Sequence, residues 1–411
     1  MRCRHCNHPL IHKMVDLGYA PPSNALRKEE DLARPELSYP LRVYVCDNCW
    51  LVQTEDYVGS ETLFPPDYVY FSSTSTTWLR HAERYTEKII DLLELHHGSF
   101  VIEIASNDGY LLKNFVQKDI PCLGIEPAEQ VAEVAERQGI PVLRRFFNKE
   151  LAEELAQKGQ KADLIIGNNV YAHVPDINDF TIGLKRALKP NGTITLEFPH
   201  LLKLIQFAQF DTIYHEHYSY LSLHTVKRIF EKAGLKIWDV EELPTHGGSL
   251  RVYGCHSEDT RVESNSVKNL LEEEMKEGLR DLKVYSEFQD KVNRIKNMFL
   301  MFLIDCKGKK KNVAGYGAAA KAATLINYAG IKPDLIPYIC DATTSKQGKY
   351  LPGSHIPIMH PSVLKEKKPD TVIIFPWNIA QEIAEQHKYI QNWGGRFVTV
   401  VPEITTIEVN Q

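Results

Sequence analysis

The sequence predicts an α/β protein whose central part is built on a parallel sheet. Three apolar runs, 99–104, 122–125 and 163–167, have the length of buried strands. A helical segment near 110–118 follows the first run, so strands and helices alternate along the chain, which favours a parallel sheet. Each run is followed by polar residues at its carboxyl end, the edge where parallel sheets bind ligands. We therefore expect a binding site at that edge.

The bulk composition excludes several classes of protein. A chain of 411 residues is long enough for two or three domains with separate cores. Its net charge of −5 gives no overall basic field for nucleic acid or an anionic membrane. No apolar run approaches about 18 residues, and the first residues lack the apolar core of a signal peptide. We expect a cytoplasmic protein without a nucleic-acid or membrane partner, whose oligomeric state is open.

Acidic and amide side chains lie at the predicted ligand-binding edge. Glu126, at the end of the second strand, is placed to accept hydrogen bonds from both hydroxyls of a ribose. An NAD site also needs such an acidic residue, but the turn after the first strand lacks the G-x-G-x-x-G that receives a pyrophosphate. We therefore predict S-adenosylmethionine as the cofactor, with a ligand-free α/β domain as the alternative. The predicted cofactor-binding residues are Glu103, Ser106, Asn107, Asp108, Gly109, Glu126, Asn168 and Asn169.

Two C-x-x-C pairs near the N-terminus predict a structural zinc site. Cys3, Cys6, Cys46 and Cys49 supply the four thiolates of a closed tetrahedral site, which holds a fold and does not activate water. A redox-active pair is the alternative, but two pairs fit zinc better than one thiol pair does. Three histidines are candidate substitutes for a cysteine and are favoured as bystanders: His5, His8 and His12.

A segment rich in aromatic and hydroxyl residues, 64–75, precedes a predicted helix over 76–95. Its serines suit a polar ligand, and we place Ser72 and Ser73 in the substrate site. The alternative is a linker whose aromatic residues pack between two domains.

A run of titratable residues follows the fourth strand, 193–200. It contains Tyr214, His215, Glu216 and His217, without the H-E-x-x-H spacing of a zinc enzyme. On an extended segment His215 and His217 would share one face and Glu216 would take the other. Because an unperturbed histidine titrates near pH 6.5, we interpret the run as acid–base machinery, to which His173 beyond the third strand contributes.

These motifs together resemble a known family. The two cysteine pairs, the turn 103–109, the run 214–217 and the motif His-Gly-Gly-Ser-Leu-Arg at 246–251 are similar to zinc-containing, S-adenosylmethionine-dependent sugar C-methyltransferases. The resemblance spans essentially the whole chain. It implies a Rossmann-like class I methyltransferase domain and methylation of carbon 3 of a nucleotide-linked 4-keto-deoxysugar, as in branched-deoxysugar biosynthesis.

The resemblance also implies roles for individual residues. His217 corresponds to the base that removes the proton from carbon 3, and Glu216 orients or assists it. Tyr214 and His173 are expected near the enolate or the sugar hydroxyls, and His215 in the substrate site. The family's pocket tyrosine falls on Tyr68 or on Tyr70, of which we prefer Tyr68.

The last third of the chain predicts charged helices over 264–300 and then a second Rossmann-like α/β unit. The sequence Gly315-x-Gly317-x-x-Ala320, with Asp341 after a later strand at 335–340, is typical of a dinucleotide site. An NAD-linked activity and a fold used only for packing are the alternatives. We prefer a site for the diphosphate of the sugar nucleotide, with Lys321 as a point charge.

The sequence thus predicts three domains: a zinc-binding module with a substrate loop (1–74), an S-adenosylmethionine-binding methyltransferase domain (75–254) and a C-terminal α/β domain that contributes to binding the sugar nucleotide (255–411). The alternative function is a methyltransferase for RNA or for an oxygen or nitrogen acceptor, with the zinc module as an interaction module.

Overall fold

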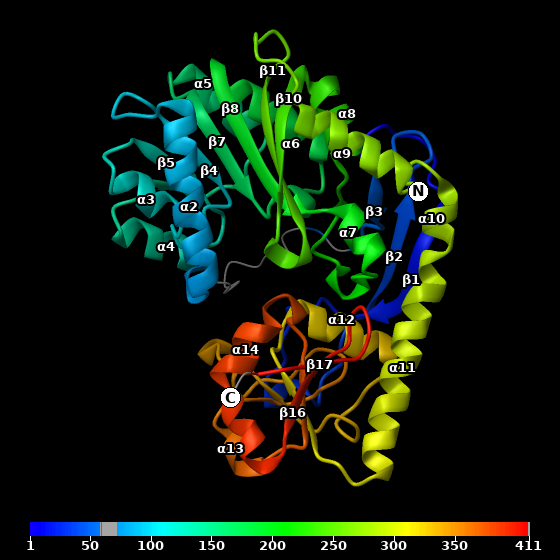
Figure 1. The fold of residues 1–411 in the computed structure, drawn as a ribbon. Helices are drawn as coiled ribbons and strands as arrows, with labels where there is room; N and C mark the ends of the chain where they lie inside the picture. The colour runs from blue at the N-terminus through cyan, green and yellow to red at the C-terminus, as the bar shows by residue number, and fades with distance from the viewer. Residues whose placement is uncertain (58, 60–71, 410–411) are drawn as a thin grey trace.

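The structure is a computed structural model that describes residues 1–57, 59 and 72–409. Tyr68 and Tyr70 therefore lie outside the described residues. The described chain forms three sheets, one near the N-terminus, one in the middle and one near the C-terminus (Figure 1). In the described part of the chain, no helix combines the length and the apolar character that crossing a membrane requires.

The N-terminal sheet is antiparallel and takes its last strand from the middle of the chain. Its order is β1 (His12–Ala20), β2 (Tyr39–Val45), β3 (Val52–Thr54) and β9 (Ser219–Tyr220). The strand β9 pairs with β3 two residues after His217. The N-terminal sheet therefore fixes the end of the run 214–217.

The central sheet confirms the predicted parallel core. Its order is β10-β11-β8-β7-β4-β5-β6, and every pairing from β8 to β6 is parallel. The strand bounds are β4 (Val101–Ile104), β5 (Cys122–Ile125), β6 (Val142–Leu143), β7 (Ala162–Asn168), β8 (Leu188–Pro199), β10 (Leu235–Leu243) and β11 (Ser249–His256).

Helices cover both faces of this sheet, which explains why its central strands are continuously apolar. Alternate residues of β4 pack on opposite sides, Val101 with α2 and α3 and Ile102 with α5, α6 and α8. The helix bounds are α2 (Thr76–Leu93), α3 (Leu112–Val116), α4 (Glu129–Arg137), α5 (Lys149–Gln157), α6 (Ile177–Ala187), α7 (Leu201–Gln206) and α8 (Leu223–Ala233).

The predicted charged helices are α9 (Asn265–Lys276), α10 (Leu282–Ser286) and α11 (Phe288–Gly308), which lead along one side of the molecule to the C-terminal sheet (Figure 1). That sheet has the order β14-β13-β12-β15-β16-β17 and is parallel except for β17. The strands are β12 (Val313–Tyr316), β13 (Ile339–Cys340), β14 (Ile358–Met359), β15 (Thr371–Ile374), β16 (Arg396–Thr399) and β17 (Thr405–Ile407), and the helices are α12 (Ala320–Ala329), α13 (Val363–Lys367) and α14 (Ala380–Gln386). The strand expected over 335–340 is shorter than predicted, because Pro337 lacks the N–H that a central strand donates.

The three sheets meet around a short segment of the central part. Helix α12 packs on the 3₁₀ turn η4 (Phe210–Thr212), and Thr324 donates a hydrogen bond of 2.8 Å to the carbonyl oxygen of Ile213. One hydrophobic cluster joins residues of β1, η4, α11 and β12. This continuous packing places the carboxyl end of the C-terminal sheet opposite the central sheet. We propose that the chain consists of three domains, 1–74, 75–254 and 255–411, which pack against one another in this region.

Candidate active site

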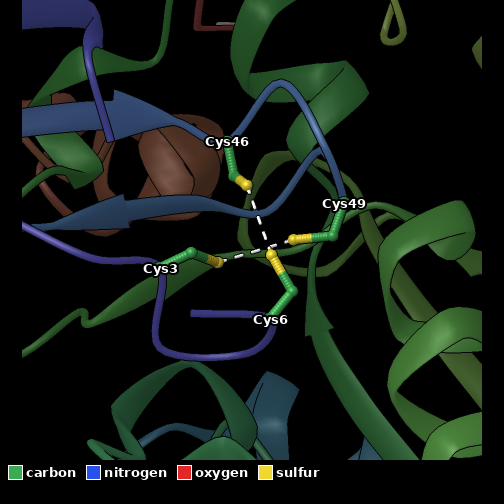
Figure 2. A group of neighbouring side chains, drawn as sticks. All are labelled: Cys3, Cys6, Cys46 and Cys49. Carbon is green, nitrogen blue, oxygen red and sulfur yellow. Dashed lines mark hydrogen bonds between the residues drawn. The ribbon is translucent and has the colours of Figure 1, made fainter. Parts of the chain in front are cut away.

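The four predicted zinc ligands come together, as Figure 2 shows. All four Sγ atoms lie within 4.8 Å of one another, and Cys3–Cys49 and Cys6–Cys46 are each separated by 3.5 Å. Zn–S bonds of about 2.3 Å place the sulfurs of a tetrahedron about 3.8 Å apart, so the cluster fits the ion. Gln53 donates a hydrogen bond to the Sγ atom of Cys3 at 3.2 Å, as expected for a thiolate.

The nearby histidines have partners outside the cysteine cluster. The Nδ1 atom of His5 lies 2.7 Å from Oδ1 of Asn178, on α6, and so ties the zinc module to the central domain. His8 and His12 both lie against Asp47, at 3.2 and 3.3 Å.

The turn after β4 has the features of a ligand-binding loop. Ala105, Asn107 and Gly109 have φ angles of 57°, 51° and 78°, a left-handed conformation that is costly for residues with a side chain. Glu126 holds the turn by accepting hydrogen bonds from the backbone N–H groups of Asn107 and Ala128, at 3.0 and 2.9 Å.

Buried polar atoms around this turn fit S-adenosylmethionine. Ser106 Oγ, Asp108 Oδ1 and Asn169 Oδ1 are buried without a hydrogen-bond partner among the described residues. Such atoms are costly unless a ligand or water satisfies them. Burial, together with the charges of Asp108 and Glu126, raises the pKa of Glu103 well above its usual value.

Gly109 is also needed for packing. A Cβ atom there would lie 2.4 Å from Cδ1 of Ile140 and 3.1 Å from the Cβ atom of Ala135. The missing side chain therefore leaves room for the helix after β5, in addition to allowing the positive φ. A Cβ atom at Gly124 would meet Ser106 Oγ at 2.5 Å.

The segment before α2 lies on this turn. The backbone N–H of Ser72 donates to Oδ1 of Asn107 at 2.9 Å, and that of Ser73 donates to Oδ2 of Asp108 at 3.1 Å. The structure thus places both serines beside the predicted cofactor residues.

The run 214–217 is a turn and not an extended segment, so the prediction of alternating faces is wrong. The backbone N–H of His217 donates to the carbonyl oxygen of Tyr214 at 2.9 Å, which closes the turn. As a result His215 points to the N-terminal sheet, where its Nε2–H donates to the carbonyl oxygen of Pro40 at 3.2 Å. His217 points elsewhere, toward His173 and Tyr214.

His217 is buried and its ring is held at one nitrogen. Its Nδ1–H donates to the carbonyl oxygen of Thr212 at 2.8 Å, so the lone pair is on Nε2. The ring centroids of Tyr214 and His173 lie 4.0 and 4.6 Å away. Burial, and then the charge of His173, lowers the pKa of His217 well below its usual value, which keeps the imidazole neutral at neutral pH.

Glu216 is held from the N-terminal module. The side-chain amide of Asn24 donates to its two carboxylate oxygens at 2.9 and 2.7 Å. Thr54, on β3, also donates to the carbonyl oxygen of His217 at 3.0 Å. The predicted base is therefore positioned by the module that carries the zinc ligands.

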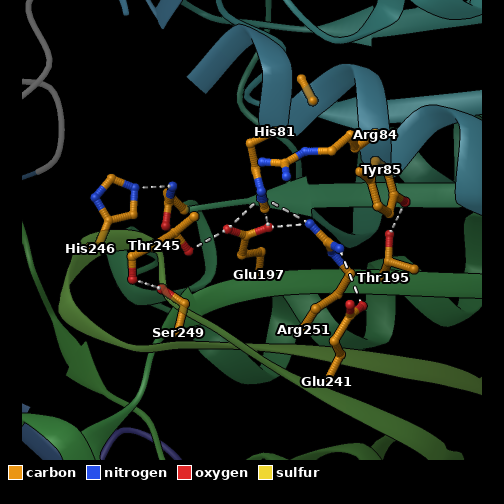
Figure 3. A network of polar contacts seen from close by, with 12 residues as sticks. His81, Arg84, Tyr85, Thr195, Glu197, Glu241, Thr245, His246, Ser249 and Arg251 are labelled. Atoms are coloured by element: carbon orange, nitrogen blue, oxygen red, sulfur yellow. Dashed lines mark hydrogen bonds and ion pairs between the residues drawn. The ribbon is translucent and has the colours of Figure 1, made fainter. Parts of the chain in front are cut away.

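Glu197 is the centre of a buried ionic network, which Figure 3 shows. Glu197, at the end of β8, accepts hydrogen bonds from His81 at 2.8 Å, from Arg251 at 2.5 Å and from Thr245 at 2.9 Å. Although burial opposes it, the hydrogen bond from His81 and the charge of Arg251 lower the pKa of Glu197 to about 2. The carboxylate is therefore charged and fixes the segment that precedes His246.

The sequence analysis assigns no role to His246, although its motif is part of the resemblance, and the structure places it beside the predicted cofactor residue Asn169. It has a φ angle of 53°, and the side-chain amide of Asn169 donates to its Nε2 atom at 3.0 Å. Its ring lies 5.2 Å from Trp78. Burial, and then the charge of Lys321, lowers the pKa of His246 to about 4.

Lys321, on the first turn of α12, contacts the segment that follows β15. Its Nζ atom donates to Oδ1 of Asn378 at 2.7 Å and lies 3.9 Å from the ring centroid of Trp377. The indole N–H of Trp377 donates to Oδ2 of Asp211 at 2.7 Å, next to the residue that holds His217. Trp377 and Asn378 end a segment, 370–378, that the sequence predicts as a strand with a polar end lining the same crevice, whereas no sequence signal points to Asp211.

The remaining residues of the motif have packing partners. Gly315 lies inside β12, where a Cβ atom would meet Ile339 at 2.6 Å, and a Cβ atom at Gly317 would meet Pro376 at 2.4 Å. Asp341 accepts hydrogen bonds from the backbone N–H groups of Ala318 and Thr343, both at 2.8 Å. These contacts within the C-terminal domain account for the presence of glycine at positions 315 and 317 and of an acidic residue at position 341.

Comparisons with known proteins match the chain along its length. Family models described as "Putative zinc binding domain", "Methyltransferase domain" and "C-methyltransferase C-terminal domain" match residues 3–64, 78–240 and 244–402. The C-methyltransferase NovU of Streptomyces niveus is 34% identical over 401 residues, which cover 98% of this chain and 95% of that protein.

Two more distant similarities concern the central part. A ubiquinone biosynthesis O-methyltransferase of Bartonella quintana is 23% identical over 211 residues, 50% of this chain and 72% of that protein. The crystal structure of magnesium protoporphyrin IX methyltransferase from Synechocystis PCC 6803 has 15% identity and a TM-score of 0.36, and it covers 48% of this chain and 92% of that chain.

Proposed function

The chain belongs to the S-adenosylmethionine-dependent C-methyltransferases, and from this premise we propose that it methylates carbon 3 of a nucleotide-linked 4-keto-deoxysugar in branched-deoxysugar biosynthesis. The observation that carries the proposal is the buried His217, whose lone pair is on Nε2 and whose ring packs on the rings of Tyr214 and His173. A carbon acceptor needs such a base, because its proton must leave before a bond to carbon forms.

The cofactor would be held at the carboxyl ends of β4, β5 and β7. Glu126 would accept hydrogen bonds from the ribose hydroxyls, since each carboxylate oxygen can accept more than the one backbone bond it has. Ser106, Asp108 and Asn169 would supply the buried polar atoms that lack partners among the described residues. When bound, S-adenosylmethionine supplies an electrophilic methyl group.

The proposed reaction begins with the removal of the proton on carbon 3. The 4-keto group acidifies this proton, and Nε2 of His217 accepts it while Nδ1–H stays on the carbonyl oxygen of Thr212. The electron pair of the C–H bond becomes the enolate, whose carbon 3 is the nucleophile. Glu216, held by Asn24, keeps the turn of His217 in place.

Tyr214 and His173 would contact the sugar ring, because their rings pack directly on the base. Burial lowers the pKa of His173 to about 4, so the ring is neutral and can share a hydrogen bond with a hydroxyl. Tyr68 is a proposed further contact from outside the described residues.

The nucleotide would lie between the central and the C-terminal sheets. The ends of β12 and β15 lead into Lys321 and Trp377, which face Asp211 and His246 of the central part. Ligands of α/β sheets bind at the carboxyl ends of strands, and two such edges meet here. Binding energy from the nucleotide would then orient the reacting carbon.

Product analysis tests the proposal. The enzyme is incubated with S-adenosylmethionine labelled with ¹³C in the methyl group and with 4-keto-6-deoxysugars linked to thymidine, cytidine, uridine or guanosine diphosphate. We expect a methyl carbon bonded to carbon 3 in one- and two-dimensional NMR spectra. A labelled methyl group on oxygen or nitrogen, or no labelling of any of the four donors, would contradict the proposal.

A further inference from the structure

Lys321 has no ion-pair partner among the described residues, although its charge acts on the predicted base. Its Nζ atom has one hydrogen-bond partner there, Oδ1 of Asn378 at 2.7 Å, and rests 3.9 Å above Trp377. Neither contact neutralises an ammonium group. A partly buried charge of this kind is retained where a ligand or a reaction supplies its complement.

Asp211 is the acidic residue whose charge acts on the pKa of Lys321, but its carboxyl is bonded to another side chain. Asp211 accepts a hydrogen bond from the indole N–H of Trp377 at 2.7 Å, while the ammonium group lies over the face of the same ring. Burial raises the pKa of Asp211 to about 6, against the effect of the charge of Lys321, so the carboxyl is mainly ionised at neutral pH but acts on the ammonium group without direct contact. Burial also lowers the pKa of Lys321 to about 8, at which the amine is still mainly protonated at neutral pH.

The ammonium group shares its surroundings with the base. The charge of Lys321 contributes to the lowered pKa of both His217 and His246. Trp377, which carries the ammonium on its face, packs against Gly247, where a Cβ atom would lie 2.3 Å from the indole ring. On the other side, α12 is bonded to Ile213 through Thr324.

We propose that Lys321 is a catalytic residue that donates a hydrogen bond from Nζ to the oxygen on carbon 4 and compensates the charge of the enolate. This inference rests on the proposed function. As the C–H bond at carbon 3 breaks, its electron pair forms the double bond between carbons 3 and 4, and the carbonyl π electrons move to the oxygen. The proton goes to Nε2 of His217, and Lys321 keeps its own proton.

The loss of an oxyanion donor and the loss of a contact to the diphosphate have different effects on binding and on rate. A diphosphate contact acts equally on the bound substrate and on the transition state, and its loss weakens binding. A donor to the developing oxyanion acts mainly in the transition state, and its loss slows the reaction.

The experiment compares full-length, zinc-loaded wild-type protein with Lys321→Met and Lys321→Arg. Exchange of the proton on carbon 3 is followed by NMR in deuterated water, without S-adenosylmethionine, and the affinity for the matching nucleoside diphosphate is measured by calorimetry. Lys365→Met is the control, because this lysine also lies over an aromatic ring of the same domain, 4.6 Å from Tyr389.

We expect Lys321→Met to slow exchange about 100- to 1000-fold, as for the loss of an oxyanion donor, with nucleoside diphosphate affinity unchanged. Lys321→Arg keeps the charge and should retain part of the rate, which also supports the assignment if the methionine variant does not fold. The control should exchange like wild type.

Exchange at the wild-type rate in Lys321→Met would overturn the inference and leave the proposed function standing. A loss of nucleoside diphosphate affinity as large as the loss of exchange would assign Lys321 to the diphosphate instead. If the wild-type protein exchanges no proton with any of the four nucleotide-linked sugars, the proposed function fails, and this inference fails with it.

Discussion

The Nδ1 atom of His217 lies 2.8 Å from the carbonyl oxygen of Thr212, and this contact determines which nitrogen of the ring is available. Thr212 belongs to η4, on which helix α12 packs, while His217 leads into β9 of the N-terminal sheet. The orientation of the predicted base therefore depends on all three parts of the chain, and several expectations follow.

Stability should fall as the pH falls from about 6.5 to about 4. His246 has a pKa of about 4 in the folded chain, and an unfolded histidine has one near 6.5, so the unfolded chain binds the extra proton in this window. His246→Asn removes this difference. Urea unfolding at pH 7.5 and pH 5 should show that wild type loses about 2 kcal/mol more than the variant. Equal losses would contradict the pKa assignment.

Zinc removal should abolish activity as well as loosen the N-terminal module. The cysteine cluster fixes the sheet whose strand β3 pairs with β9, directly after the base. Cys46→Ser should lose the bound zinc and the exchange of the carbon 3 proton together. Zinc content per chain and exchange rate are measured in parallel, with Cys340→Ser, a buried cysteine outside the cluster, as the control. Exchange at the wild-type rate by a zinc-free variant would contradict the claim that the zinc module positions the base.

The sequence predicts those parts of the molecule in which the relevant partners are close in the chain or follow a fixed spacing. The zinc ligands follow from two C-x-x-C pairs, and the parallel strands follow from short apolar runs between helices. Both predictions are confirmed.

The positions of single side chains depend on contacts between distant segments, which spacing does not reveal. The run 214–217 is compatible with an extended segment by itself, but pairing of β9 with β3 and the hydrogen bond to Thr212 bend it into a turn. Lys321 follows a nucleotide-type motif, yet the packing of α12 on η4 places it on Trp377, which is bonded to Asp211 of η4. Asn24 and Asp211 carry no motif, and only the folded chain associates them with the site.

Asn24 should act as a positioning residue for Glu216. Its amide donates to both carboxylate oxygens, so Asn24→Ala leaves the carboxylate without this contact. We expect kcat to fall roughly tenfold, within the range for groups that orient an active-site residue, with little change in KM or zinc content. Asn265→Ala, on the exposed start of α9, is the control. A change in KM alone would assign Asn24 to substrate binding.

The network around Glu197 should be a large contributor to stability. Glu197→Gln removes the closer of the two carboxylates that pair with the buried guanidinium of Arg251, and breaking a buried ion pair typically costs about 3–5 kcal/mol. Chemical unfolding measures the change. The matched control is Glu154→Gln, which breaks an exposed ion pair with Arg145 and should leave the midpoint nearly unchanged. Similar effects of both substitutions would contradict a special role for the buried network.

The most direct test of the central claim is exchange of the carbon 3 proton by wild type and by His217→Asn, followed by NMR in deuterated water without S-adenosylmethionine. We expect enzyme-dependent exchange with wild type and none with the variant, while both bind S-adenosylmethionine with the same affinity by calorimetry. Exchange by His217→Asn at a rate near that of wild type would contradict the assignment of His217 as the base.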